Sequence, residues 1–188
     1  TRMDLGGIEG FAVDAPPALG VFAAMQGAFG QPPDLVVSGV NAGLNTGRSV
    51  LHSGTVGAAL TAATFGVAAL AVSVDAADVW HWATACAVAR DGIAWLLGHP
   101  SEGAVLNLNV PARPLAELRG LRWAPLDRFG TVQTTGHDPE LGLGFELRSA
   151  AQPPVPDSDL ALVKAGFATA SVLRPPAAAD PTRLAPIE

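Results

Sequence analysis

The sequence predicts an α/β protein in which helices cover both faces of a mostly parallel sheet, a three-layer α/β/α arrangement of the Rossmann-like type. Short apolar runs bounded by turn residues are typical of strands that are buried on both faces. Helical patterns alternate with these runs, as in βαβ units. The chain has 188 residues, which is enough for one such domain. We expect a single domain over residues 1–188, with a βαβ core over 1–111, hairpins, a short helix and a last strand over 112–173, and a flexible tail over 174–188.

The first elements are a strand and a helix. Residues 11–13 form a short apolar run. Asp14 and the two prolines that soon follow it are typical of a helix start, with a carboxylate as N-cap and proline in the first turn. We expect this helix to run to about Phe29, where Gly30 ends it.

The next three elements form a strand, a helix and a strand. Residues 35–38 are a continuous apolar run, which predicts a strand buried on both faces. Residues 54–65 are rich in Ala and Leu and end at Gly66, as a helix would. Residues 68–74 are rich in small and β-branched residues and predict a second buried strand.

A long helix and a fourth strand follow, and the pattern then changes. Asp78 is a candidate N-cap for a helix that extends to Leu97, and residues 105–109 predict a strand that ends before Pro111. The later short runs alternate apolar and polar residues and resemble hairpins, a short helix and a last strand. They cover residues 121–125, 129–134, 143–147, 157–165 and 168–173.

Composition excludes some functions. The chain has 11 basic and 17 acidic residues and a formal net charge of −6, and Lys164 is its one lysine. A nucleic-acid surface needs clustered Lys and Arg, so we expect no nucleic-acid partner.

Cys86 is the one cysteine and lies in an Ala-rich helical pattern. We expect it to be a buried packing residue in a cytoplasmic protein. Residues 49–74 carry no charge, but His52 and several hydroxyl residues interrupt them, so we expect no membrane span.

The stretch 34–60 predicts an anion-binding turn. It runs from an apolar strand through a loop with Gly39, Gly43 and Gly47 onto a helix. Ligands of parallel sheets collect at the carboxyl ends of strands, and glycines let a ligand approach the backbone.

The helix after this loop begins with Ser53, Gly54 and Thr55, where free N–H groups and the helix dipole favour phosphate. The alternative is that Ser53 only caps the helix. Polar residues upstream favour the phosphate site, namely Asn41, Asn45, Thr46 and Arg48. Asn41 offers an oxygen ligand for a divalent cation, or is simply a turn residue.

These motifs resemble the SurE family of survival-protein phosphatases, which are metal-dependent nucleotidases. The resemblance rests on the run 38–43, on Asn45 and Gly47, and on 53–56. Two further segments support it, 107–111 and 157–167. It implies a Rossmann-like fold with a C-terminal hairpin extension, and 5'/3'-nucleotidase activity on nucleoside monophosphates with Mg²⁺ or Mn²⁺. It also implies a homodimer or homotetramer.

By the same resemblance, Asn41 is a metal ligand, and Ser53, Gly54, Thr55 and Asn45 bind the phosphate. Further candidates for this site are Ser38, Gly39, Gly43, Arg48 and His52. Arg48 either contacts phosphate or is a solvated loop residue, and His52 is either a proton donor or a packed loop residue. The general acid or base stays unassigned.

One part of the family pattern is missing. Family members open with a strand that ends in Asn-Asp-Asp-Gly, whose aspartates hold the metal, and this chain has no two adjacent acidic residues. We expect that an N-terminal segment is absent, that the metal is bound weakly, and that the chain is catalytically incomplete. The alternative is a non-catalytic fragment that serves binding or oligomer assembly.

Three other features stay open, and one further function is excluded. His137 and Asp138 are an acid/base pair or simply part of a surface loop. Asp75 follows a strand at the edge where ligands collect. Trp80 and Trp82 are packing residues or a platform for a base. A dinucleotide-binding domain is excluded, because no strand is followed by Gly-x-Gly-x-x-Gly with an acidic residue about 20 positions on.

Overall fold

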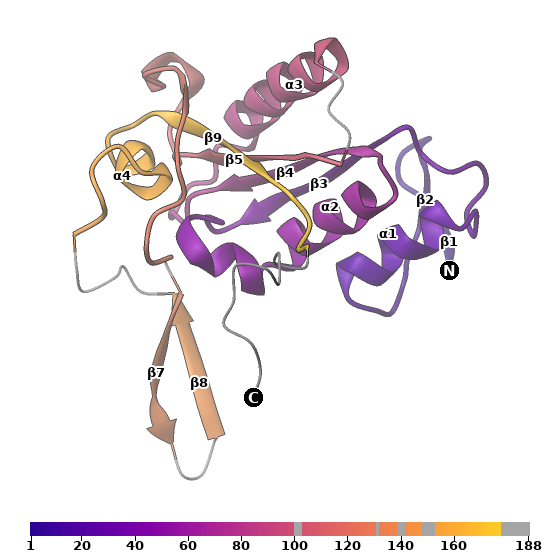
Figure 1. Cartoon of the computed structure of the whole chain (residues 1–188), viewed down its shortest axis with the longest axis horizontal. Helices are drawn as coiled ribbons and strands as arrows, with labels where there is room; N and C mark the ends of the chain where they lie inside the picture. Colours follow the sequence, from indigo (N-terminus) through magenta and orange to yellow (C-terminus); the bar gives the residue numbers. More distant parts are fainter. Residues whose placement is uncertain (100–102, 131, 139–141, 148–152, 178–188) are drawn as a thin grey trace, which may run out of the picture.

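The computed structural model describes residues 1–99, 103–130, 132–138, 142–147 and 153–177, and only the backbone of the hairpin that begins at residue 132. Within these ranges the chain forms one five-stranded sheet, two separate two-stranded sheets and four α-helices (Figure 1). No helix among the described residues has both the length and the apolar character needed to cross a membrane.

The central sheet has the strand order β3-β4-β5-β9-β6. Strands β3 (Leu35–Ala42), β4 (Ala68–Val74) and β5 (Val105–Val110) are parallel to one another. Strand β9 (Ala168–Leu173) runs antiparallel to β5, and β6 (Leu121–Trp123) runs parallel to β9. The sheet is therefore mostly parallel, as expected, with one reversal at β9.

Helices cover both faces of this sheet (Figure 1). Helix α3 (Trp82–Gly98) lies on one face, and α2 (Gly54–Thr64), with α1 (Pro17–Met25) beside it, lies on the other. The alternation of side chains along β4 explains the two layers. Its larger residues pack with α3, and its alanines Ala69 and Ala71 pack with α2. The α/β fold class is thus confirmed.

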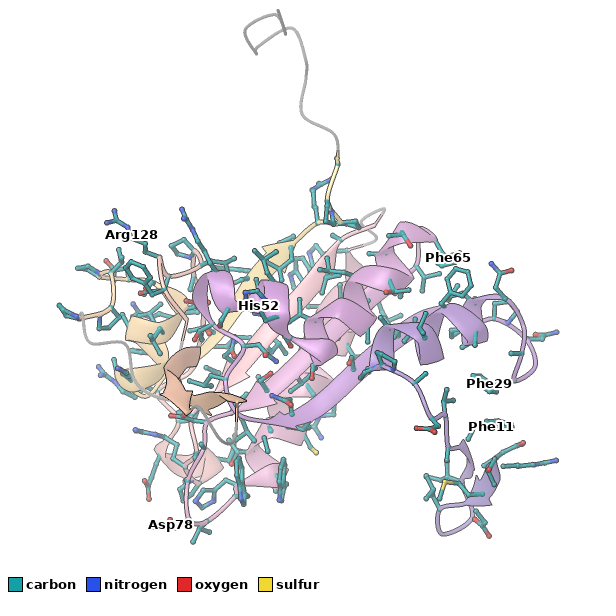
Figure 2. The ribbon with its side chains drawn as sticks, turned by 90° about the horizontal axis from the view of Figure 1, so that it is seen from below. Phe11, Phe29, His52, Phe65, Asp78 and Arg128 are labelled. Carbon is teal, nitrogen blue, oxygen red and sulfur yellow. The ribbon has the colours of Figure 1, made fainter. Side chains whose placement is uncertain are left out.

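Two hairpins lie outside the central sheet. Strands β1 (Arg2–Asp4) and β2 (Glu9–Phe11) pair antiparallel, where we expected a strand at 11–13. Figure 2 shows Phe11 near Phe29, and their stacked ring centroids are 4.7 Å apart. Strands β7 (Val132–Asp138) and β8 (Gly142–Leu147) form the second, expected hairpin, which projects away from the sheet (Figure 1).

The first helix is shorter than expected. Pro16 occupies the N-cap position of α1 without a side-chain hydrogen bond, so the prediction that Asp14 caps it was wrong. The helix ends at Met25 rather than near Phe29, because Gly27, with φ +80°, already turns the backbone out of the helix. No residue of α1 is buried, so tertiary packing does little to lengthen it.

Strand β3 is longer and more exposed than expected. It continues through the loop residues Asn41 and Ala42, because they pair with Ser73 and Val74 of β4. Among the described residues, β3 is an edge strand of the sheet, and Val37 is 46% exposed. The prediction of a strand buried on both faces was therefore wrong.

Two predictions about helix α3 were also wrong. His81, not Asp78, occupies its N-cap position, and no side chain caps the helix. Cys86 is exposed, because the face of α3 that meets the sheet carries residues such as Ala85 and Val88 instead. Because alanine occurs on several faces of this helix, its hydrophobic pattern does not indicate which face is buried, and Cys86 was assigned to the wrong face.

The C-terminal elements differ in detail. The run at 121–125 is no hairpin, because β6 pairs in parallel with β9. The short helix α4 spans Asp159–Lys164, with Ser158 as its N-cap, instead of 157–165. Of the expected tail, residues 178–188 lie outside the described residues, as do the side chains of His137 and Asp138. Two short 3₁₀ helices, η1 (Gly47–His52) and η2 (Leu115–Glu117), complete the elements.

Candidate functional site

An open pocket of about 380 Å³ lies where the carboxyl end of β3 meets the start of α2. The predicted anion-binding turn therefore forms a real concavity. Its polar lining comes from the loop, from η1 and from the first turn of α2. These polar residues are Asn41, Asn45, Ser49, His52, Ser53 and Thr55.

The start of α2 offers two free backbone donors to this pocket. Ser53 is the N-cap, and its Oγ accepts a hydrogen bond from the Val56 N–H at 3.1 Å. Capping leaves the N–H groups of Gly54 and Thr55 without a partner among the described residues. Both residues line the pocket, where the positive end of the helix dipole adds to their attraction for an anion. Ser53 is thus a cap, and the anion-binding capacity remains beside it.

Just before this loop, the backbone of β3 lies very close to β4 at Gly39. This residue has φ +131°, and a Cβ atom there would lie 2.4 Å from the Val72 carbonyl oxygen of β4. The register between β3 and β4 shifts just after it, between Ser38 and Asn41. Only glycine fits such a close approach, and the shift directs Asn41 to the pocket.

Asn41 lines the pocket and uses one end of its side-chain amide in a hydrogen bond. Its Nδ2 donates to the Gly43 carbonyl oxygen at 2.6 Å, which fixes the orientation of the amide. Its Oδ1 has no hydrogen-bond partner among the described residues. The side chain therefore holds a turn and keeps an oxygen available for a ligand, so both interpretations of this residue remain compatible with the geometry.

Asn45 is held by a buried amide network. Its backbone N–H donates to Asn109 Oδ1 at 2.8 Å, and its carbonyl oxygen accepts from Asn107 Nδ2 at 2.9 Å and from Asn109 Nδ2 at 3.0 Å. Its side-chain Nδ2 donates to Ser73 Oγ. The side-chain nitrogen is thus engaged by β4, and Asn45 anchors the loop to the sheet as well as lining the pocket.

The remaining candidates divide by position. Gly43 lines the pocket, and so does the exposed His52, which Figure 2 shows beside the start of α2. Ser38, Gly39 and Arg48 do not line it, and the side chain of Arg48 is exposed. The structure therefore brings His52 to the pocket, whereas Arg48 is exposed and does not line it.

The acidic and aromatic residues after β4 lie apart from this pocket. Asp75 and Asp78 are not among its lining residues. Desolvation by burial raises the pKa of Asp75. A hydrogen bond from the Ala76 N–H and the charge of Lys164 act to lower this pKa, but they do not offset the burial. The rings of Trp80 and Trp82 stack with centroids 5.2 Å apart, and Trp80 packs partly against the core below α3.

Asp159 is a buried carboxylate that sequence reasoning did not single out. It is fully buried and accepts three backbone hydrogen bonds, each of 2.8 Å: from Gly47 to Oδ2, and from Asp127 and Leu160 to Oδ1. Desolvation by burial raises its pKa, and the nearby charge of Asp127 adds to this, while the three N–H groups act in the opposite direction.

Asp127 is the second buried carboxylate, and it too is held by N–H and O–H donors. Its Oδ1 accepts from the Phe129 N–H at 3.0 Å, and its Oδ2 accepts from the Val155 N–H at 2.8 Å and from Ser158 Oγ at 2.6 Å. Desolvation raises the pKa of Asp127, but these hydrogen bonds together outweigh it and lower the pKa. Asp159 lies in the segment 157–167 that supports the family resemblance, but nothing in the sequence pairs it with Asp127.

Comparison with known proteins shows to which family the sequence of this chain is similar. Residues 2–131 match the family model described as "Survival protein SurE". A 5'-nucleotidase SurE from Solidesulfovibrio magneticus is 38% identical over 177 residues, covering 89% of this chain and 68% of the relative. A 5'-nucleotidase SurE from Legionella pneumophila is 40% identical over 123 residues, covering 64% and 47%. A 5'/3'-nucleotidase SurE from Proteus mirabilis is 39% identical over 153 residues, covering 75% and 57%.

The fold agrees with a solved structure. The crystal structure of the SurE protein from Aquifex aeolicus matches with a TM-score of 0.67 and 24% identity, over 86% of this chain and 67% of that one. At that identity the match concerns the fold alone. The family model covers well over half of the chain, and the motifs at the pocket lie inside the matched region. The chain belongs to the SurE family.

Proposed function

We propose that this chain supplies the phosphate-binding half of a nucleotidase, a phosphoric monoester hydrolase that acts on nucleoside monophosphates. The observation that carries the proposal is a pair of N–H groups, of Gly54 and Thr55, that lie at the start of α2 inside a pocket and have no partner among the described residues. The names of the relatives, 5'-nucleotidase and 5'/3'-nucleotidase, support the reaction class.

The residues of this chain bind and orient the phosphate group. The N–H groups of Gly54 and Thr55 donate to phosphate oxygens, and the hydroxyl of Thr55 adds a neutral donor. The same preorganised donors stabilise the charge that develops on those oxygens during hydrolysis. No lysine or arginine within the described part of the chain lines the pocket, so the helix dipole and the amides supply the attraction.

The metal of the family does not fit the donors that the described residues provide. Among these residues no group of three or more His, Cys, Asp or Glu side chains is placed to hold a metal ion. At the pocket, Asn41 Oδ1 is a single neutral oxygen, whereas Mg²⁺ and Mn²⁺ need carboxylates to offset their dehydration. We therefore derive no catalytic step through a metal held by these residues alone.

Weak metal binding is the resulting prediction. Isothermal titration of residues 1–188 with Mn²⁺ is expected to give a dissociation constant weaker than about 10⁻⁴ M, in the range of sites with few charged ligands. Asn41→Ala is expected to abolish what binding remains. A micromolar dissociation constant for the unaltered chain would contradict the prediction, because it requires carboxylate ligands that the described residues do not offer.

The function itself is tested on the natural protein with AMP as substrate and Mn²⁺ present. Asn41→Ala is expected to lower hydrolysis by about 100-fold or more, since loss of even an outer-shell metal partner typically costs 10–100-fold. Thr61→Ala is the control, because the Thr61 hydroxyl bonds only the Gly57 carbonyl oxygen within α2. Undiminished hydrolysis by Asn41→Ala would defeat the assignment.

For the natural protein we further propose a cytoplasmic homodimer or homotetramer. Exposed apolar side chains at the β6–β9 edge are compatible with assembly, since Trp123 is 56% and Val172 50% exposed. A single cysteine, exposed on α3, suits a reducing compartment.

A further inference from the structure

The wall of the phosphate pocket is supported from behind by the chain segment around residues 126–130. A Cβ atom on Gly47 would lie 2.2 Å from the Phe129 carbonyl oxygen, and one on Gly130 would lie 1.9 Å from Ser49 Oγ. Ser49 lines the pocket. The two segments therefore touch backbone to backbone, so the position of one sets the position of the other.

One carboxylate connects these two segments to α4. Asp159 Oδ2 accepts from Gly47, the first residue of η1, while Oδ1 accepts from Asp127 and from Leu160. The Asp159 N–H in turn donates to the Pro125 carbonyl oxygen at 2.9 Å. A single fully buried side chain thus fixes three segments that are far apart in sequence.

In the part of the chain that the structure describes, no cation forms an ion pair with Asp159 or Asp127. The one ion pair among the described residues joins Arg2 and Glu9, far along the chain from Asp159 and Asp127. A buried carboxylate without a cationic partner depends on the N–H groups around it, and charge-assisted hydrogen bonds of this kind are stronger than neutral ones. The bond between Gly47 and Asp159 is therefore a stiff restraint on the start of η1.

The restraint reaches the phosphate site through a short path. Helix η1 runs from Gly47 to His52 and ends directly at Ser53, the N-cap of α2. The Ser49 hydroxyl also donates to the Thr46 carbonyl oxygen at 2.6 Å, so a side-chain hydrogen bond stabilises the first turn of η1. Fixing the Gly47 N–H consequently fixes the residues that line the pocket between it and α2.

We propose that Asp159 is a positioning residue for the phosphate site, acting through Gly47 and η1, an inference that rests on the proposed function. Asp159 does not touch the ligand. It holds the pocket wall in the geometry that the N–H groups of Gly54 and Thr55 require, so that phosphate binds without first ordering the loop.

Asp159→Asn isolates this contact. The side-chain amide has one oxygen, and two donors converge on the Oδ1 position but only one on the Oδ2 position. The Asn oxygen therefore takes the Oδ1 position, and its NH₂ group faces the Gly47 N–H, donor against donor. Thr84→Val is the control, because Thr84 is a buried residue of α3, on the sheet face opposite α2. The change removes the hydrogen bond from the Thr84 hydroxyl to the Arg113 carbonyl oxygen without altering any contact of Gly47.

The test is the affinity of residues 1–188 for inorganic phosphate, measured by NMR titration well below the unfolding temperature of each variant. Asp159→Asn is expected to weaken phosphate binding by at least about tenfold, the factor that corresponds to 1.4 kcal/mol. Thr84→Val is expected to leave the affinity within about twofold, although both variants unfold at lower temperature. Equal weakening in both variants would mean that Asp159 acts only through stability, and an unchanged affinity in Asp159→Asn would overturn the inference outright.

Hydrogen exchange in the unaltered chain gives a second readout that needs no variant. Saturating phosphate is expected to slow exchange of the Gly47 amide, because binding and the restraint on η1 favour the same loop geometry. Phosphate binding with no change at Gly47 would overturn the inference and leave the proposed function standing. Absence of phosphate binding at the α2 start in the unaltered chain would defeat the proposed function and the inference together.

Discussion

Replacing Gly39 with alanine is expected to lower the free energy of unfolding by at least about 3 kcal/mol, the largest stability effect that we predict. The φ of Gly39 is +131°, which L residues rarely adopt. The added Cβ would also lie 2.4 Å from the Val72 carbonyl oxygen. Val72 is fully buried in β4, so the strand cannot move away without disturbing both core layers.

Gly57→Ala is the matched control for this experiment. Gly57 lies within α2, and a Cβ atom there meets nothing within 4 Å. Alanine is the better helix former, so this variant is expected to gain about 0.5–1 kcal/mol. Urea unfolding followed by circular dichroism measures both changes. A loss below about 1 kcal/mol for Gly39→Ala would show that β3 and β4 leave room for a side chain at Gly39.

Asn109→Ala is expected to cost about 2–4 kcal/mol and to weaken phosphate binding, because it releases the pocket loop from β5. Asn109 is fully buried and makes two hydrogen bonds to the backbone of Asn45. Its removal leaves the Asn45 N–H without an acceptor in a buried site. The penalty for such a group is about 1–3 kcal/mol, and moving the loop toward water is the way to relieve it.

Asn107→Ala tests whether the hydrogen bond or the lost volume matters. Asn107 is equally buried, lies two residues earlier on the same strand and loses the same atoms. It makes only one hydrogen bond to Asn45, and its Oδ1 already lacks a partner. We therefore expect Asn107→Ala to cost less than Asn109→Ala by about 1–3 kcal/mol in urea unfolding. Equal costs for the two variants would show that cavity formation, not the amide network, dominates.

Much of the fold could be predicted from the sequence where apolar runs end at glycine or proline. The strands over 68–74 and 168–173 and the helix that begins at residue 54 occur where expected, because each run is bounded by a clear turn residue. Helix starts were predicted poorly. Asp14 and Asp78 have the right chemistry for a cap, but neither side chain caps a helix, because the backbone enters each helix several residues later.

Long-range pairing was the harder part. The antiparallel pairing of β9 with β5 and the parallel pairing of β6 with β9 depend on contacts between segments more than 40 residues apart. Short-range patterns carry no information on such pairings, so the run at 121–125 resembled a hairpin strand. The exposure of Cys86 likewise depends on which side of an Ala-rich helix meets the sheet.

At the candidate site, the residues that line the pocket were easier to single out from the sequence than the buried residues that support them. Ser53, Gly54 and Thr55 stand out in sequence because a helix start has a recognisable chemistry. Asp127 and Asp159 are joined by one of the hydrogen bonds that hold the site, although 31 other residues of the chain lie between them. Asn107 and Asn109 gave one usable signal, since polar side chains that alternate within a buried strand require partners.

The most direct test of the central claim is a titration of residues 1–188 with inorganic phosphate, followed by amide chemical shifts in ¹H–¹⁵N NMR spectra. If the start of α2 is the phosphate site, the largest shifts belong to the Gly54 and Thr55 amides, which have no hydrogen-bond partner among the described residues. The Val56 amide, already bonded to Ser53 Oγ, is expected to shift less. Shifts confined to other parts of the chain, or no saturable shift at Gly54 and Thr55, would contradict the account.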